Sequence, residues 1–341
     1  MQKITEIKLF YLKNPKDFGD YELLDTGEGE KLERFGKYTF VRPHEDAVWP
    51  KCSTSSVQQM WTKADGKFWS SKVGAKAGWK FNHKIEEKWI MEYKPARHAS
   101  QGDAGGGVKF LASPTPFRHL GFFPEQASHW DFIEEKISEA VYTQKKNSLT
   151  LLHPTGGTFR QQNFSSAPKP KFLNLFGYTG VASLFALRAG AEVTHVDASK
   201  QILNWAKENQ KLNVELAESP MRVIEDDVLK FLEREEKRGN KYDAVIMDPP
   251  KFGRGPKGEV WKIEEMLPKL LSQVRKVLSD KPLFVILTSY ATEASSLSLG
   301  YALAETMKAF SGITEQGELC VLEKSNNRLI PLANTVVWSA N

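Results

Sequence analysis

Residues 244–252 read AVIMDPPKF, so an apolar run is followed at once by an acid, two prolines, a lysine and an aromatic ring. The apolar part predicts a buried strand. It ends at Asp248, Pro249 and Pro250, and proline lacks an N–H and fixes φ. Such a corner offers a carboxylate and carbonyls but few donors, and Phe252 could stack on a ring. The stretch predicts a platform for a flat, amino-bearing substrate, although prolines that simply stop a strand are the plainer alternative.

The ends of three strand-like segments upstream carry residues that suit a second ligand. NLFGYTG (174–180) has two glycines and a helix start, which let the backbone approach a ligand and direct free N–H groups at it. Asp197 could accept both hydroxyls of an adenosine ribose, and Asp226 or Asp227 could accept the adenine amino group. A single strand-terminal Asp is more often a helix cap. Four successive strands that end in suitable groups nevertheless favour an adenosine-containing cofactor.

Strand-like and helix-like segments alternate from residue 171 onward. Such alternation predicts βαβ units and a parallel sheet covered by helices on both faces. The strand-like runs GELCVLEKS and NTVVWSA are expected to pair antiparallel at the sheet edge. The expected fold is α/β, with a Rossmann-like sheet whose parallel strands are 171–176, 192–197, 221–227, 242–248 and 282–289.

The N-terminal third has a different pattern, because short apolar runs alternate with turn signals, as in β-hairpins. We expect a β-rich N-terminal domain over residues 1–112 and the α/β domain over residues 113–341. Residues 51–99 hold ten Lys/Arg and four Asp/Glu, a local charge of +6 in a chain with a formal net charge of +5. Aromatic residues are interleaved with these lysines. The mixture suits RNA docking, but solvated lysines around an aromatic core explain it equally well.

The glycine turn narrows the choice of cofactor. It lacks the G-x-G-x-x-G spacing of a dinucleotide site and the G-x-x-x-x-G-K-S/T spacing of a phosphate loop. S-adenosylmethionine has no phosphate, and its recognition needs a ribose acid, an adenine partner and room for the methionine group. The residues therefore match S-adenosylmethionine better than a nicotinamide cofactor. The two cysteines, Cys52 and Cys320, form no metal-ligand spacing, and we expect no metal.

These motifs resemble those of class I S-adenosylmethionine-dependent methyltransferases. NLFGYTG, HVDAS, EDDVLKFL and YDAVIMDPPKF are most similar to bacterial large-subunit ribosomal-RNA methyltransferases that make 5-methylcytosine or methylated guanine. GFFPEQ (121–126) resembles the segment that helps to close the cofactor site in that family. The resemblance covers residues 117–290, and Asn174 replaces the commoner acid of the glycine turn. It implies the class I methyltransferase fold and a cofactor site lined by Phe176, Gly177, Tyr178, Asp197, Ser199 and Asp227. With the other strand-end and turn residues, the full set of expected cofactor-binding residues is Gln126, Asn174, Phe176, Gly177, Tyr178, Thr179, Gly180, Asp197, Ala198, Ser199, Asp226, Asp227 and Asp248.

The acceptor atom is narrowed by the positions of the cysteines. Methylation of cytosine C5 needs a thiolate that adds to the ring. The family places that cysteine after the fifth strand, where this chain has Thr288, Ser289 and Tyr290. We therefore reject cytosine C5 and expect methylation of a base nitrogen, with guanine favoured. The carboxylate and the corner carbonyl would hold the amine so that its lone pair faces the methyl donor, and the expected catalytic residues are Asp248, Pro249, Pro250 and Phe252.

The predicted function is S-adenosylmethionine-dependent methyl transfer to RNA, most specifically ribosomal RNA, in the cytoplasm. The first residues show no secretory signal, and no apolar run approaches the ~20 residues of a membrane span. The alternatives are an NAD(P)-dependent oxidoreductase on the same sheet, a methyltransferase that acts on a protein or small molecule, and a binding module without turnover. We expect none of His119, His129 and His195 to be essential.

Overall fold

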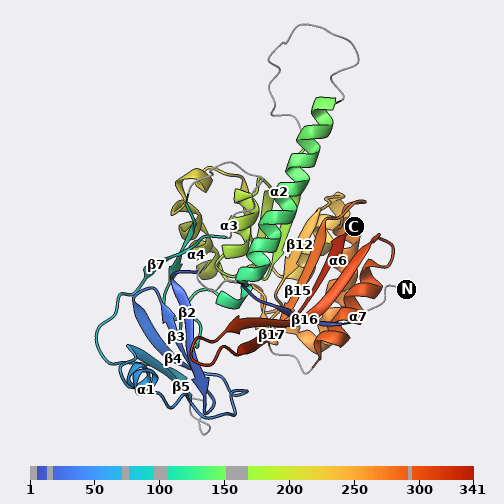
Figure 1. Ribbon diagram of the computed structural model, residues 1–341. Coiled ribbons are helices and arrows are strands. Elements are labelled where there is room, and N and C mark those ends of the chain that lie inside the picture. The colour runs from blue at the N-terminus through green and yellow to red at the C-terminus, as the bar shows by residue number, and fades with distance from the viewer. Residues whose placement is uncertain (1–5, 14–17, 71–76, 96–105, 151–167, 291–293) are drawn as a thin grey trace.

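The computed structural model describes residues 6–13, 18–70, 77–95, 106–150, 168–290 and 294–341 (Figure 1). Two parts are visible. A large sheet flanked by helices forms the later part of the chain, and a smaller β-rich part formed by the N-terminal residues packs beside it. This arrangement confirms the predicted combination of a Rossmann-like sheet and a β-rich N-terminal region.

An eight-stranded sheet is the centre of the larger part, with the order β1-β16-β17-β15-β12-β9-β10-β11 among the described strands. Five neighbouring strands run parallel, as predicted. Their side chains alternate between the two faces, so Ala244 and Ile246 enter one core while Val245 and Met247 enter the other. The five strands are β9 (Lys171–Leu175), β10 (Glu192–Asp197), β11 (Met221–Glu225), β12 (Ala244–Met247) and β15 (Phe284–Ser289).

Helices cover both faces of this sheet. On one face lie α2 (Ala127–Thr150) and α3 (Val181–Arg188), with α4 (Lys200–Lys211) beside α3. On the other face lie α5 (Val228–Arg238), α6 (Ile263–Val277) and α7 (Ser296–Met307). The 3-10 turns η2 (Pro124–Gln126) and η3 (Val214–Leu216) precede α2 and follow α4.

The predicted hairpin is confirmed, because β16 (Gly312–Leu322) and β17 (Leu329–Ala340) pair antiparallel and β17 pairs antiparallel with β15. A further strand lies beyond it. β1 (Ile7–Phe10) runs parallel to β16, and Gly317 permits this approach because a Cβ there would overlap the backbone of Lys8. The N-terminal segment therefore belongs to the large sheet, and the division of the chain at residues 112 and 113 stays a prediction.

The N-terminal part contains a five-stranded sheet with the order β2-β3-β4-β5-β6 among the described strands. Its first three strands form antiparallel hairpins, as the turn signals predict. The crossover to the parallel strand β5 contains α1 (Ser55–Thr62). These strands are β2 (Tyr21–Gly27), β3 (Glu30–Phe35), β4 (Tyr38–Pro43), β5 (Gly66–Ser70) and β6 (Ala77–Phe81), and a separate pair is formed by β7 (Trp89–Tyr93) and β8 (Val108–Ala112).

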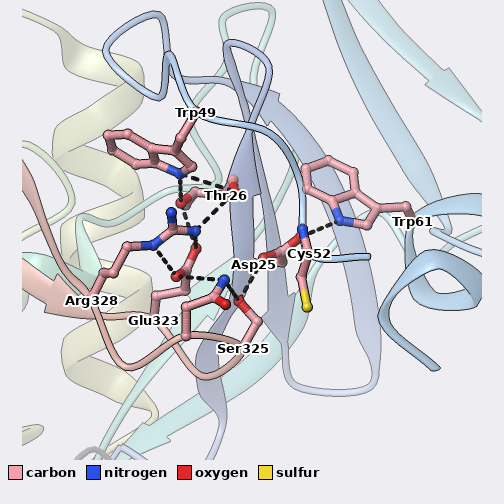
Figure 2. A network of polar contacts seen from close by, with 9 residues as sticks. Asp25, Thr26, Trp49, Cys52, Trp61, Glu323, Ser325 and Arg328 are labelled. Atoms are coloured by element: carbon pink, nitrogen blue, oxygen red, sulfur yellow. Dashed lines mark hydrogen bonds and ion pairs between the residues drawn. The ribbon is translucent and has the colours of Figure 1, made fainter. Parts of the chain in front are cut away.

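The tip of the β16–β17 hairpin ties the two parts together (Figure 2). The backbone N–H groups of Lys324 and Ser325 donate to carbonyls of β2 at 2.9 and 3.1 Å. Buried Glu323 accepts from Arg328 at 2.8 Å and from the hydroxyl of Thr26. Asp25, which is also fully buried, accepts from the Trp61 indole at 2.7 Å. Buried polar groups satisfied across this contact hold the N-terminal part in a fixed position.

The serine at the start of α2 does not cap the helix. Ser128 resembles a helix N-cap by its type, but it lies inside α2, which follows η2 directly, and its hydroxyl is buried without a hydrogen-bond partner. No described helix is both long and apolar enough to cross a membrane.

Candidate functional site

The loop between β9 and α3 has an unusual backbone. Phe176, Tyr178 and Gly180 all have positive φ, at 56°, 52° and 83°. Positive φ is costly for a residue with a Cβ, by about 1–3 kcal/mol, and such residues concentrate at binding sites. The alternating left-handed residues direct the loop's backbone into a crevice beyond the carboxyl ends of β9 and β12.

A buried hydrogen-bond chain supports this loop from beneath. The Asn174 amide donates to Ser183 Oγ at 3.0 Å, Ser183 contacts His195 Nδ1 at 3.0 Å, and His195 Nε2 contacts the Tyr178 carbonyl at 3.2 Å. Burial lowers the pKa of His195 to about 4, so the ring is neutral. Because a carbonyl only accepts, Nε2 carries the proton and Nδ1 accepts from Ser183. An ionised acid at residue 174 could not donate this hydrogen bond to Ser183, so Asn174 has a structural role in supporting the loop.

Asp197 lies at the carboxyl end of β10, next to this loop. Its two carboxylate oxygens accept from the backbone N–H of Tyr178 at 3.1 Å and of Ser199 at 2.9 Å. Burial raises the pKa of Asp197 despite these donors. The carboxylate has about four acceptor positions and receives the backbone N–H groups of Tyr178, Ser199 and Ala198, so the half-buried group can still accept a hydroxyl hydrogen from a ligand.

The other predicted residues on this side of the sheet have structural partners. Ser199 caps α4 by accepting from the Ile202 N–H at 3.4 Å, and Asp227 caps α5 by accepting from the Lys230 N–H at 3.0 Å. Asp226 forms an ion pair with Arg234. The Thr179 hydroxyl donates to the Gly121 carbonyl at 2.5 Å, so it is already paired within the protein.

Asp248 ends β12 and contributes to the lining of the crevice together with Phe176 and the glycine turn. Its carboxyl forms no hydrogen bond with any described residue. Burial, and then the nearby charge of Glu125, raise its pKa well above the ordinary value. The next residues continue the corner as predicted, with Pro249 buried and the Pro250 carbonyl accepting from the Trp261 indole at 2.6 Å.

Phe252 stands apart from this arrangement. It lies on the short strand β13 (Phe252–Arg254), which pairs with β14 (Val260–Lys262), and its side chain is 56% exposed. Phe252 is not among the described residues that line the crevice. Asp197, Ala198, Ser199, Asp226 and Asp227 also lie outside that lining, whereas Gln126, Asn174, Phe176, Gly177, Tyr178, Thr179, Gly180 and Asp248 belong to it.

Three residues that the sequence reasoning did not select lie beside Asp248. The Phe123 ring lies 4.8 Å from the ring of Tyr290 and 5.5 Å from that of Tyr178. Burial, then Glu125 and Asp248, raise the pKa of Tyr290. Glu125 is only 6% exposed, and its burial raises its pKa. Phe123 and Glu125 belong to the GFFPEQ segment, and Tyr290 directly follows the fifth strand. Their positions in the sequence could therefore have identified them as candidate site residues.

Gln126 provides a test of whether a cofactor fits. Its Nε2 donates to Tyr290 Oη at 3.1 Å, but its Oε1 is buried without a partner. An unpaired buried acceptor is costly, and a ligand donor such as the ammonium group of S-adenosylmethionine would satisfy it. The remaining acceptor capacity of Asp197 suits a ribose hydroxyl, and the backbone of the glycine turn lines the crevice. The residues present therefore suit this cofactor.

His119, His129 and His195 do not supply acid–base groups near neutral pH. His119 and His129 have pKa values lowered to about 3 by burial, with Arg42 adding to the effect at His119. His129 contacts Thr335 Oγ1 at 2.8 Å inside the core. Within the described ranges, no group of three or more His, Cys, Asp and Glu side chains could hold a metal ion.

A second, wider hollow lies at the opposite ends of β9, β10 and β11. Lys171, Arg222 and Tyr242 contribute to its lining. It is adjacent to the fully buried Glu235, which accepts from Arg222 at 3.0 Å and from Tyr242 at 2.7 Å. These partners satisfy the Glu235 carboxylate, whereas Glu192, which also lines the hollow, is exposed to solvent. Because open parallel sheets bind ligands at carboxyl ends, the crevice at Asp248 is the better candidate site.

Comparison with known proteins identifies relatives of this chain. Residues 144–297 match the family model described as Conserved hypothetical protein 95. Ribosomal RNA large subunit methyltransferase K/L of Pseudoalteromonas translucida is 37% identical over 146 residues, which are 42% of this chain and 20% of that protein. Ribosomal RNA large subunit methyltransferase I of Aeromonas hydrophila is 30% identical over 151 residues, 44% of this chain and 30% of that protein. The chain thus spans less than a third of the length of either relative.

Solved structures extend the likeness over the whole fold. The S-adenosylmethionine-dependent methyltransferase from Agrobacterium tumefaciens is 36% identical, with a TM-score of 0.79 and coverage of 100% of this chain and 98% of that one. The methyltransferase SMU.776, solved with S-adenosylhomocysteine, shares the fold at 16% identity, with a TM-score of 0.63 and coverage of 94% and 75%. The chain belongs to the S-adenosylmethionine-dependent methyltransferases, and S-adenosylmethionine is its cofactor.

Proposed function

We propose that this methyltransferase acts on RNA, specifically on a base nitrogen of ribosomal RNA, with guanine favoured. The observation that carries the proposal is the position of Asp248, whose unpaired carboxyl shares a crevice with the glycine turn. An acceptor amine must be held in one orientation and must then lose a proton. A carboxyl with a raised pKa beside a proline corner without N–H donors suits both tasks.

The cofactor residues are proposed from their positions around the crevice. Asp197 would accept the ribose hydroxyls, Gln126 would accept from the methionine ammonium group, and Asp226 or Asp227 would face the adenine amino group. The turn itself would contribute backbone groups, and the full set is Gln126, Asn174, Phe176, Gly177, Tyr178, Thr179, Gly180, Asp197, Ala198, Ser199, Asp226, Asp227 and Asp248. When bound, S-adenosylmethionine supplies an electrophilic methyl group on a sulfonium.

The catalytic work falls to the corner at the end of β12. Asp248 and the Pro249 carbonyl accept hydrogens of the exocyclic amine, which fixes its orientation in the crevice. Loss of one proton must accompany methylation of the nitrogen, and the unpaired Asp248 carboxylate is placed to take it. Phe123 and Tyr290 offer ring faces beside this corner, so they are better placed than the exposed Phe252 to hold a flat base.

The cysteines oppose methylation at cytosine C5. Cys320 lies on β16, is only 2% exposed, and has its pKa raised to about 12 by burial. Cys52 lies in the N-terminal part beside Asp25. Neither is placed at the strand end where Tyr290 lies, so a thiolate addition to a base in this crevice has no nucleophile.

RNA is favoured as the acceptor by two features. The curated relatives are named as ribosomal RNA methyltransferases, and the local charge of residues 51–99 is +6. We propose that residues 1–112 form a docking domain for the RNA and residues 113–341 the catalytic domain. The exposed Arg254 and Lys257, beyond the proline corner, would contact phosphates on the other side.

Nucleoside mass spectrometry tests the proposal. Ribosomal RNA from cells with and without the gene is digested, and a methylated guanine is expected to be absent without the gene. Purified enzyme with labelled S-adenosylmethionine should restore it, and Asp248→Asn should not. Identical nucleoside profiles in the two strains, together with labelling of a protein fraction by the purified enzyme, would exclude RNA as the substrate.

A further inference from the structure

A line of aromatic rings leads from the crevice to the N-terminal part. Phe123, whose ring lies beside Tyr290, also lies 4.9 Å from the ring of His119. Two residues before His119, the Phe117 carbonyl accepts from the Trp79 indole N–H at 3.1 Å. The ring of Trp79 in turn stacks on Phe81 at 5.9 Å, with 5° between the planes. We call these residues the aromatic track: Phe123, His119, Phe117, Trp79 and Phe81.

The outer end of the track is exposed to solvent. The Phe117 side chain is 72% exposed and the Phe81 side chain is 38% exposed. Single exposed apolar residues are common on protein surfaces. Here, however, the Phe81 ring stacks on Trp79, and the indole of the same tryptophan donates to the Phe117 carbonyl. The inner end of the track, at Phe123, lines the crevice of the proposed acceptor site.

Two cations without ion-pair partners accompany the outer rings. Arg118 has an exposed side chain that pairs with no described acid, while its carbonyl accepts from Arg42 Nη1 at 3.0 Å. Lys84, three residues after Phe81, is also exposed and unpaired among the described residues. The acid near this corner is occupied, because Asp65 accepts from Thr39 at 2.6 Å and contacts His83 at 3.0 Å. Positive charge therefore remains available beside the rings.

Resting on the proposed function, we propose that the aromatic track binds single-stranded RNA next to the acceptor base. Phe117 and Phe81 stack with bases, and Arg118 and Lys84 contact the phosphates. Every base has a π-face, so exposed rings beside cations hold single strands with little sequence preference. A paired duplex would keep its bases stacked on one another, whereas an acceptor amine that enters the crevice must already be unpaired.

Residues 71–76 and 96–105 of the basic region, which include Lys72, Lys76 and Arg97, lie outside the described part of the chain. The track is defined instead by the described contacts at its two ends. Phe117 and Arg118 lie next to each other on one loop, so the ring and the guanidinium can each be removed by a separate substitution.

Fluorescence anisotropy with a labelled single-stranded RNA of about 15 nucleotides tests the track. Phe117→Ala should weaken binding by about tenfold, since one base-stacking contact is worth roughly 1–3 kcal/mol. Arg118→Ala should lower the slope of log affinity against log salt by about 0.7. Tyr142→Ala on α2 and Lys281→Ala before β15 are matched controls, because both side chains are exposed elsewhere. Calorimetry with S-adenosylmethionine should give the same affinity for all four variants.

The results that would contradict RNA binding by the aromatic track can be told apart from one another. Unchanged RNA binding by both track variants, in an enzyme that still methylates ribosomal RNA, refutes the track and leaves the proposed function intact. If the track variants bind RNA normally but lose methylation only on intact ribosomal particles, the track contacts a protein instead of RNA. If the wild-type enzyme neither binds nor methylates RNA, the proposed function itself fails.

Discussion

Replacement of Gly177 by alanine tests how the glycine turn is held over β10. A Cβ at residue 177 would overlap His195 Cε1 and lie 2.5 Å from Nδ1. The ring cannot swing aside freely, because it is fully buried and both nitrogens are hydrogen-bonded, to Ser183 and to the Tyr178 carbonyl. Either the turn rises or the ring leaves its partners.

The size of the destabilisation follows from these two rearrangements, a raised turn or a displaced His195 ring. Overpacking of a buried site costs about 1–3 kcal/mol, and a lost hydrogen bond costs about 0.5–1.5 kcal/mol. We therefore expect Gly177→Ala to lower the free energy of unfolding by about 2–4 kcal/mol in urea titrations. The shift also displaces the Tyr178 N–H from Asp197, so the dissociation constant of S-adenosylhomocysteine, measured by calorimetry, should rise by about tenfold.

Two further variants make the test specific. Gly78→Ala on β6 is the control, because its Cβ would meet only Trp69 Nε1 at 3.9 Å, an ordinary contact, and its stability should change by less than about 0.5 kcal/mol. His195→Ala removes the overlapping ring, so the double variant Gly177→Ala/His195→Ala should cost less than the sum of the single changes. Strictly additive costs, or a Gly177→Ala enzyme with normal stability and cofactor affinity, would refute the proposed packing.

Other predictions concern charge at the site and in the fold. Asp197→Asn should weaken S-adenosylhomocysteine binding about 10–100-fold in calorimetry, because the amide replaces charge-assisted acceptors of the ribose hydroxyls. Activity should fall with decreasing pH at values above the ordinary pKa of an aspartate, because burial and Glu125 raise the pKa of Asp248; Glu125→Gln should move this limb of the kcat profile to lower pH, and an unmoved limb would contradict the assignment. Glu235→Gln should destabilise the fold by about 1–3 kcal/mol in urea titrations, because Arg222 and the Tyr242 hydroxyl lose a buried charged acceptor. Burial alone would raise the pKa of Glu235, but Arg222, Tyr242 and Asn240 lower it to about 2, so its contribution is present above about pH 4.5 and lost as the pH falls toward 2.

Much of the parallel sheet was predictable, because continuous apolar runs are what a strand buried on both faces requires. The runs that became β9, β10, β12 and β15 are of this kind. β1 was not predictable in the same way. Its four residues are mostly exposed, and its place beside β16 depends on the absence of a Cβ at Gly317, which no local pattern reveals.

The candidate site divides along similar lines. Residues at strand ends, such as Asp197 and Asp248, could be located because the ends of parallel strands meet at one edge of the sheet. Glu125 and Tyr290 lie far apart in the sequence and meet only because η2 packs beside the end of β15. The cap role of Asp227 was weighed against a ligand role from its residue type, and only the bond to the Lys230 N–H shows that it caps α5.

Diffraction from crystals grown with S-adenosylhomocysteine tests the central claim most directly. The ribose hydroxyls are expected on the carboxylate of Asp197, the ammonium group on Gln126 Oε1, and the sulfur facing Asp248 across the crevice. A ligand bound in the hollow beside Tyr242, or side chains that close the crevice against it, would contradict the placement of the methyl donor at the carboxyl ends of the strands.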